Sequence, residues 1–182
     1  MLSNLAASRG PVAQGAPDFL QEFKRLMSLN ASAVAVITCA EPDGARYGLA
    51  VTSVSSFSVE PPSVLICVNR TAEAHEPLRR AGRFGVNFLC DGQRDIANRF
   101  AGMQGEKNEA KYAGGDWSST RNGVPILRDA FFWLECEVLH AAPILTHTVF
   151  IGKVITACGG DGRPAVYFGR DYVSIGAATP AG

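Results

Sequence analysis

The sequence has no excess charge of either sign, because 17 Lys and Arg residues balance 17 Asp and Glu residues over 182 positions. A protein that binds duplex nucleic acid usually carries a basic excess, so this balance argues against a nucleic-acid partner. Charged residues are few, at 19%, whereas hydrophobic residues make up 47%. That much apolar surface excludes a disordered chain, and the length favours one domain.

Long hydrophobic runs and paired cysteines are also missing. No apolar run approaches the roughly 20 residues of a membrane-spanning helix, and the N-terminus has no secretory core, so we expect no membrane partner. The cysteines never approach Cys-x-x-Cys spacing, which predicts neither a disulfide framework nor a metal site. They are Cys39, Cys67, Cys90, Cys136 and Cys158. A reducing, cytoplasmic location fits this usage.

The common nucleotide and hydrolase motifs are absent. Neither Gly-x-Gly-x-x-Gly nor Gly-x-x-x-x-Gly-Lys-Ser/Thr occurs, which excludes a Rossmann fingerprint and a Walker loop. Gly-x-Ser-x-Gly is missing too, so there is no nucleophile elbow. If the protein binds a nucleotide, it binds it in another way.

What the sequence does have is a series of short apolar segments separated by turn residues. Asp18 precedes an amphipathic helix of about three turns, and residues 34–38 and 47–52 form a hairpin around Pro42-Asp43-Gly44. Further strands are predicted at 56–59, 63–68, 84–89, 131–139, 148–156 and 165–168, with short helices at 75–81 and 94–100. Strand-helix-strand alternation is missing, so we predict a mainly β fold, an antiparallel closed or partly closed barrel. Residues 17–176 form the domain, with tails at 1–16 and 177–182.

One segment concentrates hydroxyl groups at a strand end. Thr52, Ser53, Ser55 and Ser56 surround Val54. Such a segment can cradle an anion such as a phosphate with hydroxyl and backbone N–H groups. A Ser/Thr-rich strand edge without a ligand is the alternative.

A second polar segment, Asn69-Arg70-Thr71, follows the most apolar strand. The Asn69 amide can pair with the edge of a heterocycle, and Arg70 or Thr71 can reach a phosphate, or the segment simply caps a loop. Of the histidines, His147 lies at a strand start, and we expect His75 to be exposed.

No acid, base or nucleophile pattern completes a catalytic site. Glu135 and Glu137 share one face of a predicted strand, where solvated or subunit-facing roles are expected rather than acid-base catalysis. Loops suited to phosphate without catalytic groups fit a protein whose cofactor carries out the reaction.

Five segments together resemble the short-chain flavin reductases. They are residues 47–69, 84–89, 99–103, 146–154 and 167–170. The match extends over about residues 19 to 175, and its specificity lies in the order and spacing of the segments. The family includes reductase components of two-component monooxygenases, such as that of 4-hydroxyphenylacetate 3-monooxygenase, and has the FMN-binding split-barrel fold.

The resemblance implies an NAD(P)H:flavin oxidoreductase that supplies reduced flavin to a separate monooxygenase. It implies a homodimer, FMN or FAD as flavin, and NADH or NADPH as hydride donor. His147 matches a histidine near the nicotinamide. The flavin and nucleotide contacts implied are Ala50, Val51, Thr52, Ser53, Val54, Ser55, Ser56, Val68, Asn69, Thr71, Ala72, Arg99, Phe100, Tyr167, Phe168, Gly169 and Arg170. Two alternatives are a flavin-binding protein or electron carrier without turnover of free flavin, and, with less support, a haem-binding relative.

Overall fold

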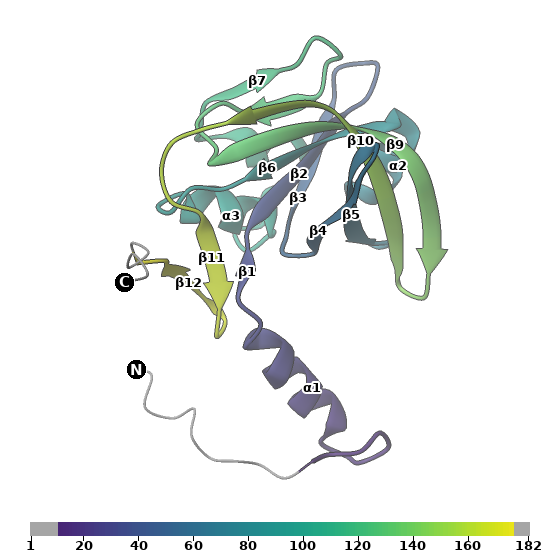
Figure 1. Cartoon of the computed structure of the whole chain (residues 1–182), viewed down its shortest axis with the longest axis vertical. Coiled ribbons are helices and arrows are strands. Elements are labelled where there is room, and N and C mark those ends of the chain that lie inside the picture. The colour runs from purple at the N-terminus through teal and green to yellow at the C-terminus, as the bar shows by residue number, and fades with distance from the viewer. Residues whose placement is uncertain (1–10, 177–182) are drawn as a thin grey trace.

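The structure of the chain is a computed structural model that describes residues 11–176. Positions 1–10 and 177–182 of the two expected tails lie outside the described residues. Most of the described chain is antiparallel β-structure, which confirms the predicted mainly β class (Figure 1).

A seven-stranded antiparallel sheet curves into the split barrel. Its strand order is β3-β2-β6-β9-β10-β5-β4. The bounds are β2 (Ala35–Ala40), β3 (Arg46–Val51), β4 (Val54–Val59), β5 (Pro62–Asn69), β6 (Arg83–Phe88), β9 (Phe132–Ile144) and β10 (His147–Gly159). The predicted hairpin is β2–β3. In its turn, the Asp43 Oδ1 accepts a hydrogen bond from the Ala45 N–H at 3.0 Å, and Gly44 supplies a φ of 87°.

Two small sheets and four helical segments make up the rest of the secondary structure in the described residues. The sheets are β1 (Ser32–Ala33), β11 (Ala165–Phe168) and β12 (Asp171–Ser174), and the pair β7 (Trp117–Ser119) and β8 (Pro125–Leu127). The helices are α1 (Phe19–Ser28), α2 (His75–Ala81), α3 (Arg94–Phe100) and the 3₁₀ segment η1 (Asn108–Tyr112). In Figure 1, α1 extends away from the barrel, below β1 and β11.

Strand β2 separates two apolar cores. Ala35, Ile37 and Cys39 face one core, inside the barrel, while Val34, just before the strand, and Val36 face the other. The two-residue period of a strand explains this division, and it requires a strand that is apolar on both faces. Burial raises the pKa of the Cys39 thiol to about 12, which keeps it protonated and fits a buried, hydrophobic role.

The second core is closed by a buried hydrogen-bond network around Asn87. Its amide nitrogen donates to the Val36 carbonyl at 3.0 Å and to the Thr38 hydroxyl at 3.1 Å, and its Oδ1 accepts from the Leu127 N–H at 2.8 Å. Thr38 in turn donates to the Pro125 carbonyl at 2.6 Å. The network therefore attaches β8 to the outer face of β2 and β6.

We expect Asn87→Ala to lower the free energy of unfolding by about 2–4 kcal/mol, because buried partners lose their hydrogen bonds. Urea denaturation followed by circular dichroism measures the change. Arg121→Ala, at an exposed position of the β7–β8 turn, is the control and is expected to change stability by less than about 0.5 kcal/mol. Equal midpoints for the two variants would show that the network does not stabilise the fold.

Several sequence-based expectations need correction. The strands β7, β8 and β12 were not predicted, because segments of three or four residues carry too little periodicity. His75 is not exposed: 5% of its surface is accessible, and its Nε2 lies 2.8 Å from the Thr148 hydroxyl. Glu135 is neither solvated nor free for a subunit contact, because it is 2% exposed and accepts a hydrogen bond from Asn122. Asp18 precedes α1 as predicted, but its side chain makes no capping hydrogen bond.

Candidate functional site

The hydroxyl-rich segment connects β3 to β4, the two edge strands of the large sheet. Thr52 and Ser53 lie between the two strands, and both are exposed. The Ser53 hydroxyl donates to the Cys67 carbonyl at 3.0 Å, while the Cys67 N–H donates to the Ser53 carbonyl at 3.4 Å. Ser55 donates to the Ser56 carbonyl at 3.2 Å. The segment is thus fixed against β5, with its exposed hydroxyls available to a ligand.

A cavity of about 190 Å³ lies beside this segment. The predicted residues Ala50, Val51, Thr52 and Tyr167 line it together with Val34, Ala101, Met103 and Tyr172. Its wall is mainly apolar, with one exposed hydroxyl and two phenol rings. A flat, largely apolar ring system suits such a lining.

Arg99 and Phe100 form the end of α3 next to this cavity. Phe100 is 2% exposed and packs against Tyr112 at 5.1 Å and Trp117 at 5.3 Å between ring centroids. A Cβ at position 48 would lie 2.7 Å from the Phe100 ring, so Gly48 permits this packing. Phe100 therefore supports the cavity wall from inside the core. Arg99, which is partly exposed, is the positively charged residue at this end of α3.

The second predicted loop begins where β5 ends. The Asn69 Oδ1 accepts hydrogen bonds from the Thr71 N–H and the Thr71 hydroxyl, both at 3.0 Å, and the Ala72 N–H donates to the Asn69 carbonyl at 3.0 Å. Asn69 thus holds the turn, as the loop-cap interpretation requires. Val68 is fully buried in the barrel core, so its side chain is not part of an open surface.

His147 lies directly opposite Asn69 in the ladder between β10 and β5. Facing residues in an antiparallel pair project to the same side of the sheet, so the structure brings the predicted histidine beside the second loop. The imidazole is exposed, and its Nδ1 lies 2.9 Å from the Thr146 hydroxyl. This contact orients the ring and leaves Nε2 for a ligand.

The final predicted segment forms the hairpin between β11 and β12. Gly169 and Arg170 make its two-residue turn with φ values of 61° and 69°, as primed hairpin turns require. Tyr167 packs against Tyr172 at 5.3 Å between ring centroids. Phe168 is half-buried, and the Gly169 N–H donates to the Ser28 carbonyl at 2.7 Å.

The predicted residues therefore form two groups in one chain. Tyr167 lies at the cavity beside Thr52, whereas Asn69 and His147 lie at the β5–β10 end of the sheet, and Ser53 contacts β5 between them. In Figure 1, the β11–β12 hairpin is well separated from the tip of the β9–β10 hairpin.

Sequence reasoning missed Tyr172. It lines the cavity, its hydroxyl donates to the Asn98 Oδ1 at 3.3 Å, and the Arg94 guanidinium lies 5.2 Å from its ring centroid. Burial raises the pKa of this phenol, while Arg94 opposes the shift. The sequence signal that could have indicated Tyr172 is the β11–β12 hairpin, in which a Gly-Arg turn lies between two tyrosines.

Sequence reasoning also missed Lys111, which is 8% exposed. Its Nζ lies 2.9 Å from the Glu73 Oε2 and 3.4 Å from the Gly48 carbonyl. Glu73 follows the second loop, and Gly48 precedes the first. Lys111 therefore ties both predicted loops to η1, and no sequence motif indicates a lysine that becomes buried by pairing.

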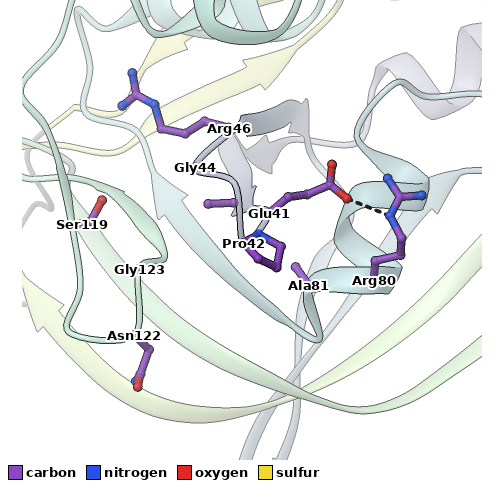
Figure 2. A pocket seen from close by; sticks show the side chains of 10 residues that line it. Glu41, Pro42, Gly44, Arg46, Arg80, Ala81, Ser119, Asn122 and Gly123 are labelled. Atoms are coloured by element: carbon purple, nitrogen blue, oxygen red, sulfur yellow. Dashed lines mark hydrogen bonds and ion pairs between the residues drawn. The ribbon is translucent and has the colours of Figure 1, made fainter.

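Another cavity, of about 560 Å³, lies at the opposite end of the β2–β3 hairpin. Figure 2 shows the ion pair between Arg80 and Glu41 beside it, at 2.7 Å. Its second arginine, Arg46, is paired with Glu109. None of the predicted site residues lines this cavity, so the cavity beside Thr52 is the better candidate for the predicted ligand.

Within residues 11–176, no three His, Cys, Asp or Glu side chains are grouped to hold a metal ion. No helix of the described chain has the length and apolar content needed to cross a bilayer.

The antiparallel barrel has the split-barrel fold of solved flavin reductases. The sequence model of the flavin reductase like domain matches residues 27–176, and the chain belongs to that family.

Similar proteins support this assignment over most of the chain. The FMN reductase (NADH) RutF of Pseudomonas syringae pv. syringae is 36% identical over 160 residues, covering 87% of this chain and 88% of that protein. The reductase component of the FADH(2)-dependent resorcinol hydroxylase of Rhizobium sp. is 38% identical over 164 residues, covering 89% of each chain. The solved structure of the Streptomyces globisporus NADH:FAD oxidoreductase SgcE6 superposes with a TM-score of 0.81 at 27% identity, covering 93% of this chain and 100% of that one.

Proposed function

We propose that the chain is an NADH:flavin oxidoreductase that delivers reduced flavin to a separate monooxygenase. The observation that carries the proposal is the cavity beside Thr52, where the predicted flavin contacts of β3 meet Tyr167 and the end of α3. Relatives named as NADH-dependent flavin reductases and as a hydroxylase reductase component support it. These names include both FMN and FAD enzymes, so the proposal names a flavin without choosing between FMN and FAD.

The residues fit a flavin by their chemistry. Thr52, Ser53, Ser55 and Ser56 offer hydroxyls to the phosphate and the ribityl chain, and Arg99 supplies a positive charge. Backbone around Ala50, Val51 and Val54 contacts the ring system. The second loop contributes Val68, Asn69, Thr71 and Ala72, Phe100 shapes the pocket, and Tyr167, Phe168, Gly169 and Arg170 complete the nucleotide side.

The protein's part in the reaction is mainly positioning. A bound flavin would supply the acceptor for a hydride from the reduced nicotinamide. The chain must hold the two rings stacked about 3–3.5 Å apart and exclude water between them. His147, oriented by Thr146, would hold the nicotinamide nucleotide through Nε2, with proton transfer as its second role.

A homodimer is part of this proposal. The apolar face of α1 is uncovered in the single chain: Leu20, Phe23, Leu26 and Met27 are each 52–57% exposed. Exposed apolar faces of this kind mark interaction sites. A second copy would cover this face of α1. We further propose residues 17–176 as the reductase domain and a cytoplasmic location.

Air oxidation of NADH and NADPH by the purified protein, with added FMN, FAD or riboflavin, tests the activity. We expect flavin-dependent loss of absorbance at 340 nm with NADH. Tight flavin binding without turnover would favour the electron-carrier alternative, and no oxidation with any flavin and either nucleotide would reject the reductase. Comparing the rates assigns FMN or FAD and tests NADPH.

A further inference from the structure

Arg99, the proposed phosphate ligand, already has an anionic partner. Its Nη1 lies 3.0 Å from the Glu106 Oε1. The side chains of Arg99 and Glu106 are only 30% and 21% exposed, so solvent screens this ion pair less than a fully exposed pair. The guanidinium is therefore held by a carboxylate from its own chain.

The ion pair is incompletely satisfied. The second carboxylate oxygen of Glu106, Oε2, is buried and has no hydrogen-bond partner among residues 11–176. A buried carboxylate oxygen without a hydrogen-bond donor is energetically unfavourable, and this cost weakens the ion pair between Arg99 and Glu106. The contact is thus open to competition from an anion that pairs with Arg99 and leaves no buried oxygen without a donor.

The segment that carries Glu106 also borders the cavity beside Thr52, where we propose that the flavin binds. Ala101 and Met103, in the same connection after α3, line that cavity. Gly102 and Gly105 lie on either side of Met103 with φ values of 74° and 81°. The Glu106 carboxylate and two residues of the cavity wall therefore lie on one short connection. A movement of this connection would affect both the ion pair and the cavity.

We infer that Glu106 is a specificity-determining residue: its carboxylate holds Arg99 where a flavin phosphate would bind, and so weakens the binding of phosphorylated flavins. This inference rests on the proposed function. A phosphate monoester carries close to two negative charges and pairs well with a guanidinium, so it can displace the carboxylate. Binding then loses the energy of the broken ion pair, and riboflavin, which has no phosphate, loses nothing.

This competition suits a reductase that must release its product. A weakened phosphate contact lets reduced flavin leave for a separate enzyme, because a lower affinity is mostly expressed as faster dissociation. Glu106 therefore adjusts affinity without touching the ring that receives the hydride.

Glu106→Gln tests the inference by titration of FMN and of riboflavin into the purified protein, followed by flavin fluorescence. We expect the Kd for FMN to fall about 3- to 10-fold, while the Kd for riboflavin stays within about 2-fold. An equal gain for both flavins, or no gain for FMN, would overturn it. Thermal unfolding verifies that the variant is folded.

Glu109→Gln is the matched control, because it removes another ion pair of the same region, with Arg46, away from the flavin cavity. It should leave both affinities unchanged. Arg99→Met distinguishes the proposed phosphate contact from the role of Glu106. It should weaken the binding of FMN and leave the binding of riboflavin unchanged. If Arg99→Met behaves so but Glu106→Gln does not tighten FMN, only the inference about Glu106 fails. If the unmodified protein oxidises no NADH with any flavin, the proposed function fails.

Discussion

Replacing His147 by alanine is expected to lower kcat/KM for NADH oxidation by about 10- to 100-fold, the range for a positioned group that contacts the reacting nucleotide. The flavin Kd should change little, because the hydroxyl segment and Arg99 lie elsewhere and Asn69 is held by hydrogen bonds from Thr71 rather than by His147. His147 is exposed, lies opposite Asn69 and is oriented by Thr146, so removing it costs no core packing. Stopped-flow reduction of bound flavin and flavin titration measure the two quantities.

His140→Ala is the control for this prediction, since His140 is also exposed and lies on the neighbouring strand β9. It should retain the full rate. Thr146→Val, which removes the partner of the His147 Nδ1, should give a smaller loss than His147→Ala, mainly in KM if the histidine positions the nucleotide. Unchanged kinetics in His147→Ala would remove this residue from the mechanism.

Gly152→Ala is expected to lower the free energy of unfolding by about 2–4 kcal/mol, because a new methyl group overpacks the barrel core. Its Cβ would lie 2.7 Å from the Phe84 Cε1 and 2.9 Å from the Cys136 Cβ. Phe84 and Cys136 are fully buried, so neither can move aside without displacing its neighbours. Urea denaturation followed by circular dichroism measures the loss, and failure to obtain folded protein counts as the same result.

Gly159→Ala is the matched change on the same strand. Nothing lies within 4 Å of a Cβ at position 159, and its φ is not in the left-handed region. Its free energy of unfolding should stay within about 0.5 kcal/mol of the parent. If both glycine variants lose equal stability, steric overlap with Phe84 is not the cause.

Local signals predicted the elements that have strong periodicity or clear turn residues. The β2–β3 hairpin was found because apolar runs flank Pro42-Asp43-Gly44, and α2 because Gly82 ends it with a φ of 64°. β7 and β8 were missed, since Asn87 and Thr38 stabilise β8 from distant parts of the chain. Short strands held by such long-range bonds leave little local pattern.

The misjudged polar residues have a similar explanation. His75 and Glu135 looked exposed because His75 opens a short helix beside Glu76 and Glu135 faces the side opposite the barrel core. The structure covers them with β10 and with the turn between β7 and β8, where Thr148 and Asn122 provide their hydrogen bonds. Whether a polar side chain is buried depends on what folds over it, which one segment of sequence cannot show.

By itself, the sequence determined the mainly β class, the hydroxyl-rich Thr52–Ser56 segment and, through the order of five segments, the flavin reductase family. The first two features depend on residue type and near spacing, which are local properties, and the third depends on the order of segments along the chain. Only the tertiary structure decided that Thr52 and Tyr167 share a cavity, that Asn69 faces His147, and that Glu106 neutralises Arg99. Such pairings join residues brought together by strand register and loop packing, and burial then sets which charges must find partners.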